Sequence, residues 1–136
     1  MMTMRWTAAL GGGALWTLAT VWNASLEPRG NSGITGSARV ESFAADSALA
    51  ELTVNGAKPG SALAWGLHGG PCATLGSLRG EEANYPAIPV DSTGTGTSRA
   101  TIRPGLEEPG AYAIVVHGGD RTGAVASCGE LKRAGN

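Results

Sequence analysis

The sequence predicts an all-β domain, a Greek-key β-barrel or sandwich held by one disulfide. Three observations carry this prediction. From residue 33 onward, short segments with strand-like patterns are separated by Gly and Pro turn signals. Beyond the first two dozen residues, no helical periodicity of useful length occurs. The chain of 136 residues has only two cysteines, Cys72 and Cys128.

Residues 1–24 have the composition of a targeting signal. Arg5 is the only charged residue before Glu27, and residues 6–21 are apolar or weakly polar. A positive n-region followed by an apolar h-region is the pattern of a leader that directs export. A buried first helix is the weaker alternative, because residues 11–13 are all glycine and glycine destabilises a helix interior. We therefore expect an exported protein, periplasmic or extracellular.

The fate of the leader has two alternatives. We expect cleavage after Ala24, although Trp22 then stands where the cleaving peptidase prefers a small residue. The other alternative is an uncleaved leader that tethers the domain to a membrane, although the apolar stretch is short and glycine-rich against a full span of about 20 residues. Residues 25–32 are then expected to form a linker, residues 33–131 the domain and residues 132–136 a C-terminal tail.

The domain is expected to consist of short strands. Turn signals such as Pro59-Gly60 separate them. One segment has Leu49 on one face and Leu52 on the other, which a β-bulge or a one-residue shift would reconcile. The stretch from residue 69 to 96 is expected to be rich in loops. The expected strands are residues 36–43, 48–55, 63–68, 97–102, 111–117 and 125–131.

The barrel core is expected on the apolar faces of these strands. Side chains two residues apart share one face of a strand. Trp65 and Leu67 therefore point inward together, while Gly66 and His68 point outward. The expected core residues are Leu52, Val54, Leu63, Trp65, Leu67, Ile102, Tyr112, Ile114 and Val116.

The two cysteines are expected to form a disulfide. An isolated pair in an oxidising compartment usually does so, and no CxxC spacing supports a metal or redox pair. The bridge from Cys72 to Cys128 closes a loop of more than fifty residues. In the chain-entropy model such a loop is worth about 4 kcal/mol.

Only two histidines occur, His68 and His117. Each ends an expected strand on the face opposite the large apolar side chains, and each is followed by two glycines. A histidine in that position can bind a metal ion, or it can be a solvated polar residue. The sequence pattern leaves both alternatives open.

These landmarks resemble the copper/zinc superoxide dismutase family over about residues 33–131. The resemblance implies a superoxide dismutase-like barrel, a disulfide between Cys72 and Cys128, and copper held by His68 and His117. Four runs carry it, in the family's order: a strand with its turn (54–60), a histidine strand leading to the first cysteine (65–72), the last histidine strand (112–117) and the closing strand with the second cysteine (126–131).

The chain also departs from the family at its metal site. The family's His-x-His pair is reduced to Gly66 and His68. The loop from Ala73 to Thr97 contains no histidine, so the zinc site and the bridging ligand are missing. Val125 stands where the family has its active-site arginine, and Arg121 lies four residues earlier. We therefore expect no zinc and no catalytic residues, with copper between His68 and His117 as the remaining metal hypothesis.

The charge balance argues against nucleic-acid binding. Ten Lys and Arg residues against eleven Asp and Glu give a formal net charge of −1. Without a basic cluster, the electrostatic footprint of a nucleic-acid binder is missing. We therefore expect a non-catalytic exported module that binds a partner or serves a structural role, with its protein partner unspecified by the sequence. The alternative is a copper-binding protein or residual superoxide dismutase that uses His68 and His117.

Overall fold

The computed structural model describes residues 19–43, 46–108 and 110–135. Its secondary structure consists of strands and two 3₁₀ turns, η2 (Cys72–Thr74) and η3 (Glu82–Asn84). The strands are β2 (Thr20–Pro28), β3 (Thr35–Phe43), β4 (Ser47–Asn55), β5 (Ala62–Leu63), β6 (Trp65–Gly69), β7 (Ile88–Pro89), β8 (Gly96–Ile102), β9 (Tyr112–His117), β10 (Val125–Glu130) and β11 (Lys132–Arg133).

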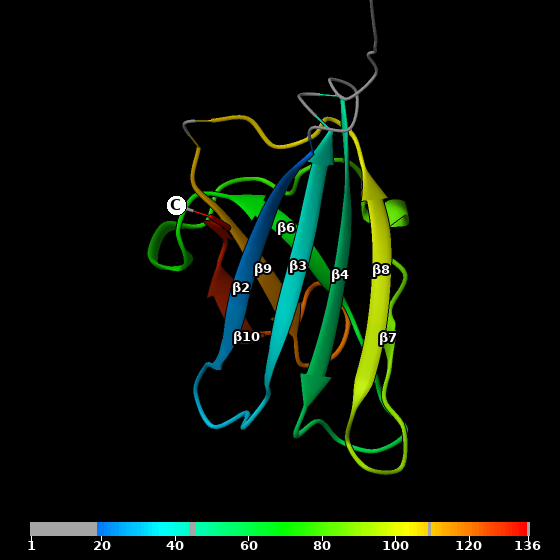
Figure 1. Ribbon diagram of the computed structural model, residues 1–136. Helices are drawn as coiled ribbons and strands as arrows, with labels where there is room; N and C mark the ends of the chain where they lie inside the picture. Colours follow the sequence, from blue (N-terminus) through cyan, green and yellow to red (C-terminus); the bar gives the residue numbers. More distant parts are fainter. Residues whose placement is uncertain (1–18, 44–45, 109, 136) are drawn as a thin grey trace, which may run out of the picture.

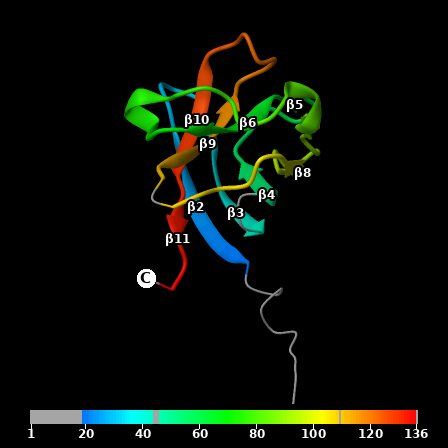
Figure 2. The ribbon, with the colours of Figure 1, turned by 90° about the horizontal axis from the view of Figure 1, so that it is seen from above.

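The main sheet is antiparallel and runs in the order β6-β9-β10-β2-β3-β4-β8, with β11 added to β2. Strands β2, β3, β4 and β8 form the near wall of Figure 1, and β6 and β9 lie behind them. Seen from above in Figure 2, the sheet curls round into a half-barrel. The short pair β5-β7 lies beside β8, to which it is joined by a bridge between Val90 and Gly96. The all-β prediction is therefore confirmed.

The core fills the inside of this curl. Alternation along the strands produces it, because every second side chain of β2, β3 and β4 is buried. Trp65, Leu67, Ile114 and Val116 are completely buried. Two edge-to-face aromatic pairs are part of it, and one of them joins Trp65 to Tyr85 with ring centroids 5.1 Å apart. All nine core residues expected from the sequence are buried.

The first strand contradicts the boundaries expected at the amino terminus. Residues 25–28, expected as linker, are part of β2, which pairs with β3 on one side and β10 on the other. Trp22, Ala24 and Leu26 alternate into the core and are at most 8% exposed. The alternating pattern of β2 was hidden in the sequence, because the apolar residues of the expected leader continue into the strand without a break. The folded domain therefore includes residues from Thr20, and leader residues 1–18 lie outside the described residues.

Two smaller expectations also differ from the structure. Lys132 and Arg133, expected in a tail, form β11 against Asn23 and Trp22. Strand β4 runs without a bulge and in unbroken register with β3 and β8. Leu49 accordingly lies half-buried on the outer face, where an apolar side chain costs little.

The expected disulfide between Cys72 and Cys128 is confirmed. It ties the loop after β6 to β10, and it is compatible with an exported protein. In the described residues there is no helix long and apolar enough to cross a membrane.

Candidate functional site

His68 lies at the end of β6, where it pairs with Ala113 of β9. Its Nδ1 is 3.0 Å from the carbonyl oxygen of Gly76. A carbonyl can only accept a hydrogen bond, so Nδ1 is the donor. The Nε2 of His68 is buried and has no hydrogen-bond partner among the described residues. The ring is thus oriented by Nδ1, and its Nε2 makes no hydrogen bond to the described residues.

His117 lies at the end of β9 and is 9% exposed. Its backbone N–H donates to the carbonyl of Ala64, and its Nδ1 donates to the carbonyl of Gly123 at 2.9 Å. The pKa of nearby Asp120 is lowered, first by the hydroxyl of Thr122 and to a smaller degree by the charge of His117. The tight loop after β9 therefore holds both the imidazole and a carboxylate.

The structure does not bring the two imidazoles together. Both lie on the outer face of adjacent strands, as expected, but His68 pairs with Ala113, four residues before His117. At about 3.4 Å per residue, this offset separates their backbones by roughly 14 Å along the strands. The nearer neighbour of His117 on β6 is Gly66, which pairs with Val115.

Arg121 and Leu78 fill the space outside Gly66. A Cβ placed on Gly66 would meet the Cδ1 of Leu78 and would lie 3.1 Å from Nη1 of Arg121. The guanidinium donates from Nη2 to the carbonyl of Trp65 at 2.8 Å, and its Nε is 3.4 Å from a carboxylate oxygen of Glu82. The arginine side chain is only 20% exposed. A positive charge is therefore fixed where the resembled family has its first copper ligand.

These residues do not fit a copper centre of that family. Redox copper sites use three or four nitrogen or sulfur donors in a defined geometry. Across residues 19–43, 46–108 and 110–135, no group of three or more His, Cys, Asp or Glu side chains is arranged to hold a metal ion. The fixed guanidinium of Arg121 also repels a cation. Copper binding to His68 or His117 stays a prediction.

Sequence reasoning missed the position of Arg121. The residue was placed near the site but out of position, because Val125 occupies the family's arginine position. In the structure Val125 packs beside Ala113, Val115 and Cys128. The loop between β9 and β10 instead folds back to carry Arg121 over Gly66. The one available signal was the absence of a side chain at Gly66, which leaves room for an incoming group.

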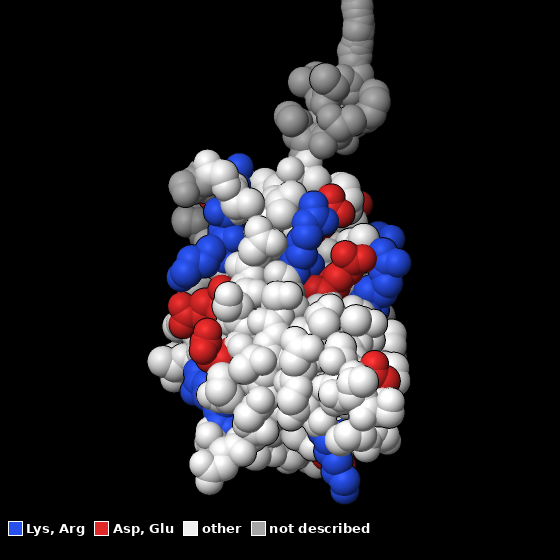
Figure 3. Space-filling view, turned by 60° about the horizontal axis from the view of Figure 1, so that its bottom comes forward, with Lys and Arg blue, Asp and Glu red and all other residues white. Residues whose placement is uncertain are grey.

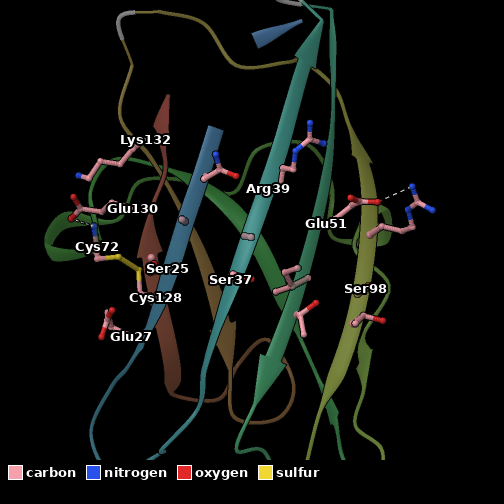
Figure 4. A pocket seen from close by; sticks show the side chains of 18 of the residues that line it. Ser25, Glu27, Ser37, Arg39, Glu51, Cys72, Ser98, Cys128, Glu130 and Lys132 are labelled. Atoms are coloured by element: carbon pink, nitrogen blue, oxygen red, sulfur yellow. Dashed lines mark hydrogen bonds and ion pairs between the residues drawn. A yellow bond between two sulfur atoms is a disulfide. The ribbon is translucent and has the colours of Figure 1, made fainter. Parts of the chain in front are cut away.

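A second candidate site is an open hollow of about 1410 Å³. It crosses the outer face of the sheet from β10 over β2, β3 and β4 to β8 (Figure 4). At one end lie Cys72 and Glu130, whose carboxylate accepts a hydrogen bond from the Cys72 N–H at 3.2 Å. At the other end lie Pro86 and Pro89 of the segment beside β8.

Two cross-strand rows form the floor of this hollow. The first is a row of hydroxyls in direct register: Ser25, Ser37, Thr53 and Thr97. The second row lies beside the first on the same face and contains charges of both signs and one amide. Its members are Lys132, Asn23, Arg39, Glu51 and Arg99. Within it, Arg99 and Glu51 form an ion pair at 2.8 Å. None of the described lining residues is aromatic.

The charged row is part of a wider division of the surface. In the view of Figure 3 most charged side chains lie in the upper half, and a broad uncharged surface lies below them with a few charged side chains at its edges. The hydroxyl row lies next to the charged row, so the hollow offers both kinds of surface to a ligand.

Comparison with models of known protein families and with curated protein sequences finds no match.

Proposed function

We propose that the protein is an exported, non-catalytic binding module with a superoxide dismutase-like Greek-key barrel. The strand order supports the Greek-key part, because β2, β3 and β4 are consecutive hairpin strands and β10 returns from far along the chain to lie beside β2. The disulfide between the loop after β6 and β10 supports both the family resemblance and export.

The hollow is the observation that carries the binding role. A site of this extent spans five strands, or roughly 19 Å at about 4.8 Å per strand, which suits the surface of a protein partner. The mixture of Lys132, Arg39 and Arg99 with Glu51 and Glu130 favours a partner with charges of both signs. Nucleic acid is disfavoured as a partner. Proteins bind single strands on aromatic side chains in a positively charged groove, whereas the described lining of the hollow has no aromatic residue and carries charges of both signs.

Crosslinking tests the binding role. A photoreactive amino acid at Thr97, in the hollow, is expected to crosslink one discrete protein when the chain is expressed in its source cells. Ser37→Trp would fill the floor next to Thr53 and abolish that crosslink. Lys58→Trp is the matched control, on an exposed turn outside the hollow, and should leave it intact. A crosslink that survives Ser37→Trp would contradict the proposal.

The placement of Arg121 supports the non-catalytic part of the proposal. Copper turnover needs an open coordination position near the metal, and here a guanidinium and Leu78 occupy the space. The purified domain, incubated with copper and zinc, is expected to show negligible superoxide dismutation. A rate near the diffusion ceiling of such enzymes would contradict this.

Copper binding without dismutation is the second candidate. The observation in its favour is that both imidazoles donate from Nδ1 to a backbone carbonyl, Gly76 for His68 and Gly123 for His117. Metal-binding histidines are commonly held in this way, with Nε2 left for the metal.

Calorimetric titration with Cu²⁺ tests whether the two imidazoles share one copper site. A shared site loses copper in both His68→Gln and His117→Gln. The offset of roughly 14 Å along the strands predicts instead that neither variant changes copper binding at the other imidazole. Gly66→His alone is expected to add no affinity, because its side chain meets Leu78 and Arg121. The double variant Gly66→His/Arg121→Ser removes the positive charge and tests whether a new pair with His117 can form.

A further inference from the structure

The first strand restricts where the leader can be cut. Residues Thr20–Leu26 pair one for one with β3, and Asn23 and Trp22 pair with Lys132 and Arg133 of β11. Cleavage after Ala24 would remove the first five residues of this strand. Residues 38–42 of β3 would lose their backbone partners on the β2 side, and β11 would lose both of its partners.

The same cut would also empty part of the core. Trp22 is 4% exposed, and its ring lies edge-on to Tyr112 with centroids 5.7 Å apart. Ala24, the residue before the cut, is itself buried. A mature chain beginning at Ser25 would therefore lack both a large aromatic side chain and the hydrogen bonds that place it.

We propose that the leader is removed between Ala19 and Thr20. The inference rests on the proposed export. Ala19 and Thr17 supply small residues at the last and third-last positions of the leader, as a cleavage site of the A-x-A kind requires. Residues 6–16 then form the apolar segment, which fits the length of about 7–15 residues of an h-region.

This bond lies directly before the first residue of β2. Ala19 precedes β2 and has no regular secondary structure, and Thr20 is the first residue of β2, where it pairs with Ser42. Cutting here keeps every described strand intact. It also removes the difficulty at Trp22, which no longer occupies a position that disfavours large side chains.

Intact-mass measurement and amino-terminal sequencing test the bond. The full chain is expressed in a bacterial host with its own leader, and the exported protein is recovered from the periplasm and denatured before analysis. The expected amino terminus is Thr20. Ala19→Leu is expected to retain the leader, whereas the matched variant Ala24→Val is expected to give the same Thr20 terminus.

The contrary outcomes are distinct. An exported protein that begins at Ser25, or one that keeps the leader as a membrane anchor, overturns the cleavage at Ala19 while leaving export intact. A chain found only in the cytoplasm with its leader attached overturns export itself. Because the readout is a mass, it does not depend on whether either variant folds.

Discussion

Removing the disulfide is expected to lower the free energy of unfolding by about 4 kcal/mol. Cys72 and Cys128 are 56 residues apart in the chain. In the chain-entropy model a loop of that length restricts the unfolded chain by about 14 cal/mol/K, or about 4 kcal/mol at 25 °C. The native state contributes little to this figure, because the loop after β6 is held by other contacts as well. Among them are the hydrogen bonds from Gly76 to Gly69 and from Arg79 to Leu67.

The variant should avoid new buried polar groups. Cys128 is 2% exposed, and it packs beside Ala113 and Val115. A serine there would bury a hydroxyl, so the double variant Cys72→Ala/Cys128→Ala isolates the loss of the bridge.

Urea denaturation followed by tryptophan fluorescence measures the effect, since Trp22 and Trp65 are both in the core. The reduced parent protein is the control, and its stability should match that of Cys72→Ala/Cys128→Ala to within about 0.5 kcal/mol. A loss below about 1 kcal/mol in both would refute the loop-entropy reasoning.

Three further predictions concern the core and its titrating groups. Leu26→Ala should cost about 2–5 kcal/mol in urea denaturation, whereas Ser25→Ala, on the outer face of the same strand, should cost less than about 0.5 kcal/mol. Burial raises the pKa of Tyr85 from 10.0 to about 12; stability should therefore fall as the pH rises from 10 toward 12, and Tyr85→Phe should remove that fall in alkaline unfolding curves. Hydrogen bonds from Thr hydroxyls and backbone amides hold the pKa of Asp91 and of Asp120 below 3.8; NMR titration should place both midpoints below that value, and their stabilising effect should be lost as the pH falls through them.

Local sequence patterns predicted most of the longer strands and the core residues on them. The longer strands from residue 35 onward were predicted because alternation and turn residues lie within each segment, whereas the two-residue strands β7 and β11 were missed. Trp65 and Leu67 were placed in the core by strand periodicity alone. Strand β2 was missed because an apolar leader and a half-buried strand are both rich in apolar residues. The pairing of β2 with β3 and with β10, about a hundred residues away, is what distinguishes the strand from a leader.

The candidate sites depended on contacts that no local pattern contains. The positions of His68 and His117 on the outer face were predicted, but their four-residue offset depends on the register between β6 and β9. The placement of Arg121 depends on how the loop before β10 folds back. The hollow joins residues from seven strands, and in the sequence its hydroxyl row is four Ser and Thr residues that lie far apart.

The neighbouring positions of β2 and β10 have a consequence for the order of folding. The first described strand finds its partner only when the segment around Cys128 and the β11 residues have followed it. Until then β2 has β3 as a partner on one side, within the sheet β2-β3-β4-β8, and its other edge is unpaired. Closure of the sheet and of the disulfide therefore waits for the last part of the chain. A chain threaded across a membrane from its amino terminus would therefore complete its sheet and its disulfide only on the far side, where thiols are oxidised.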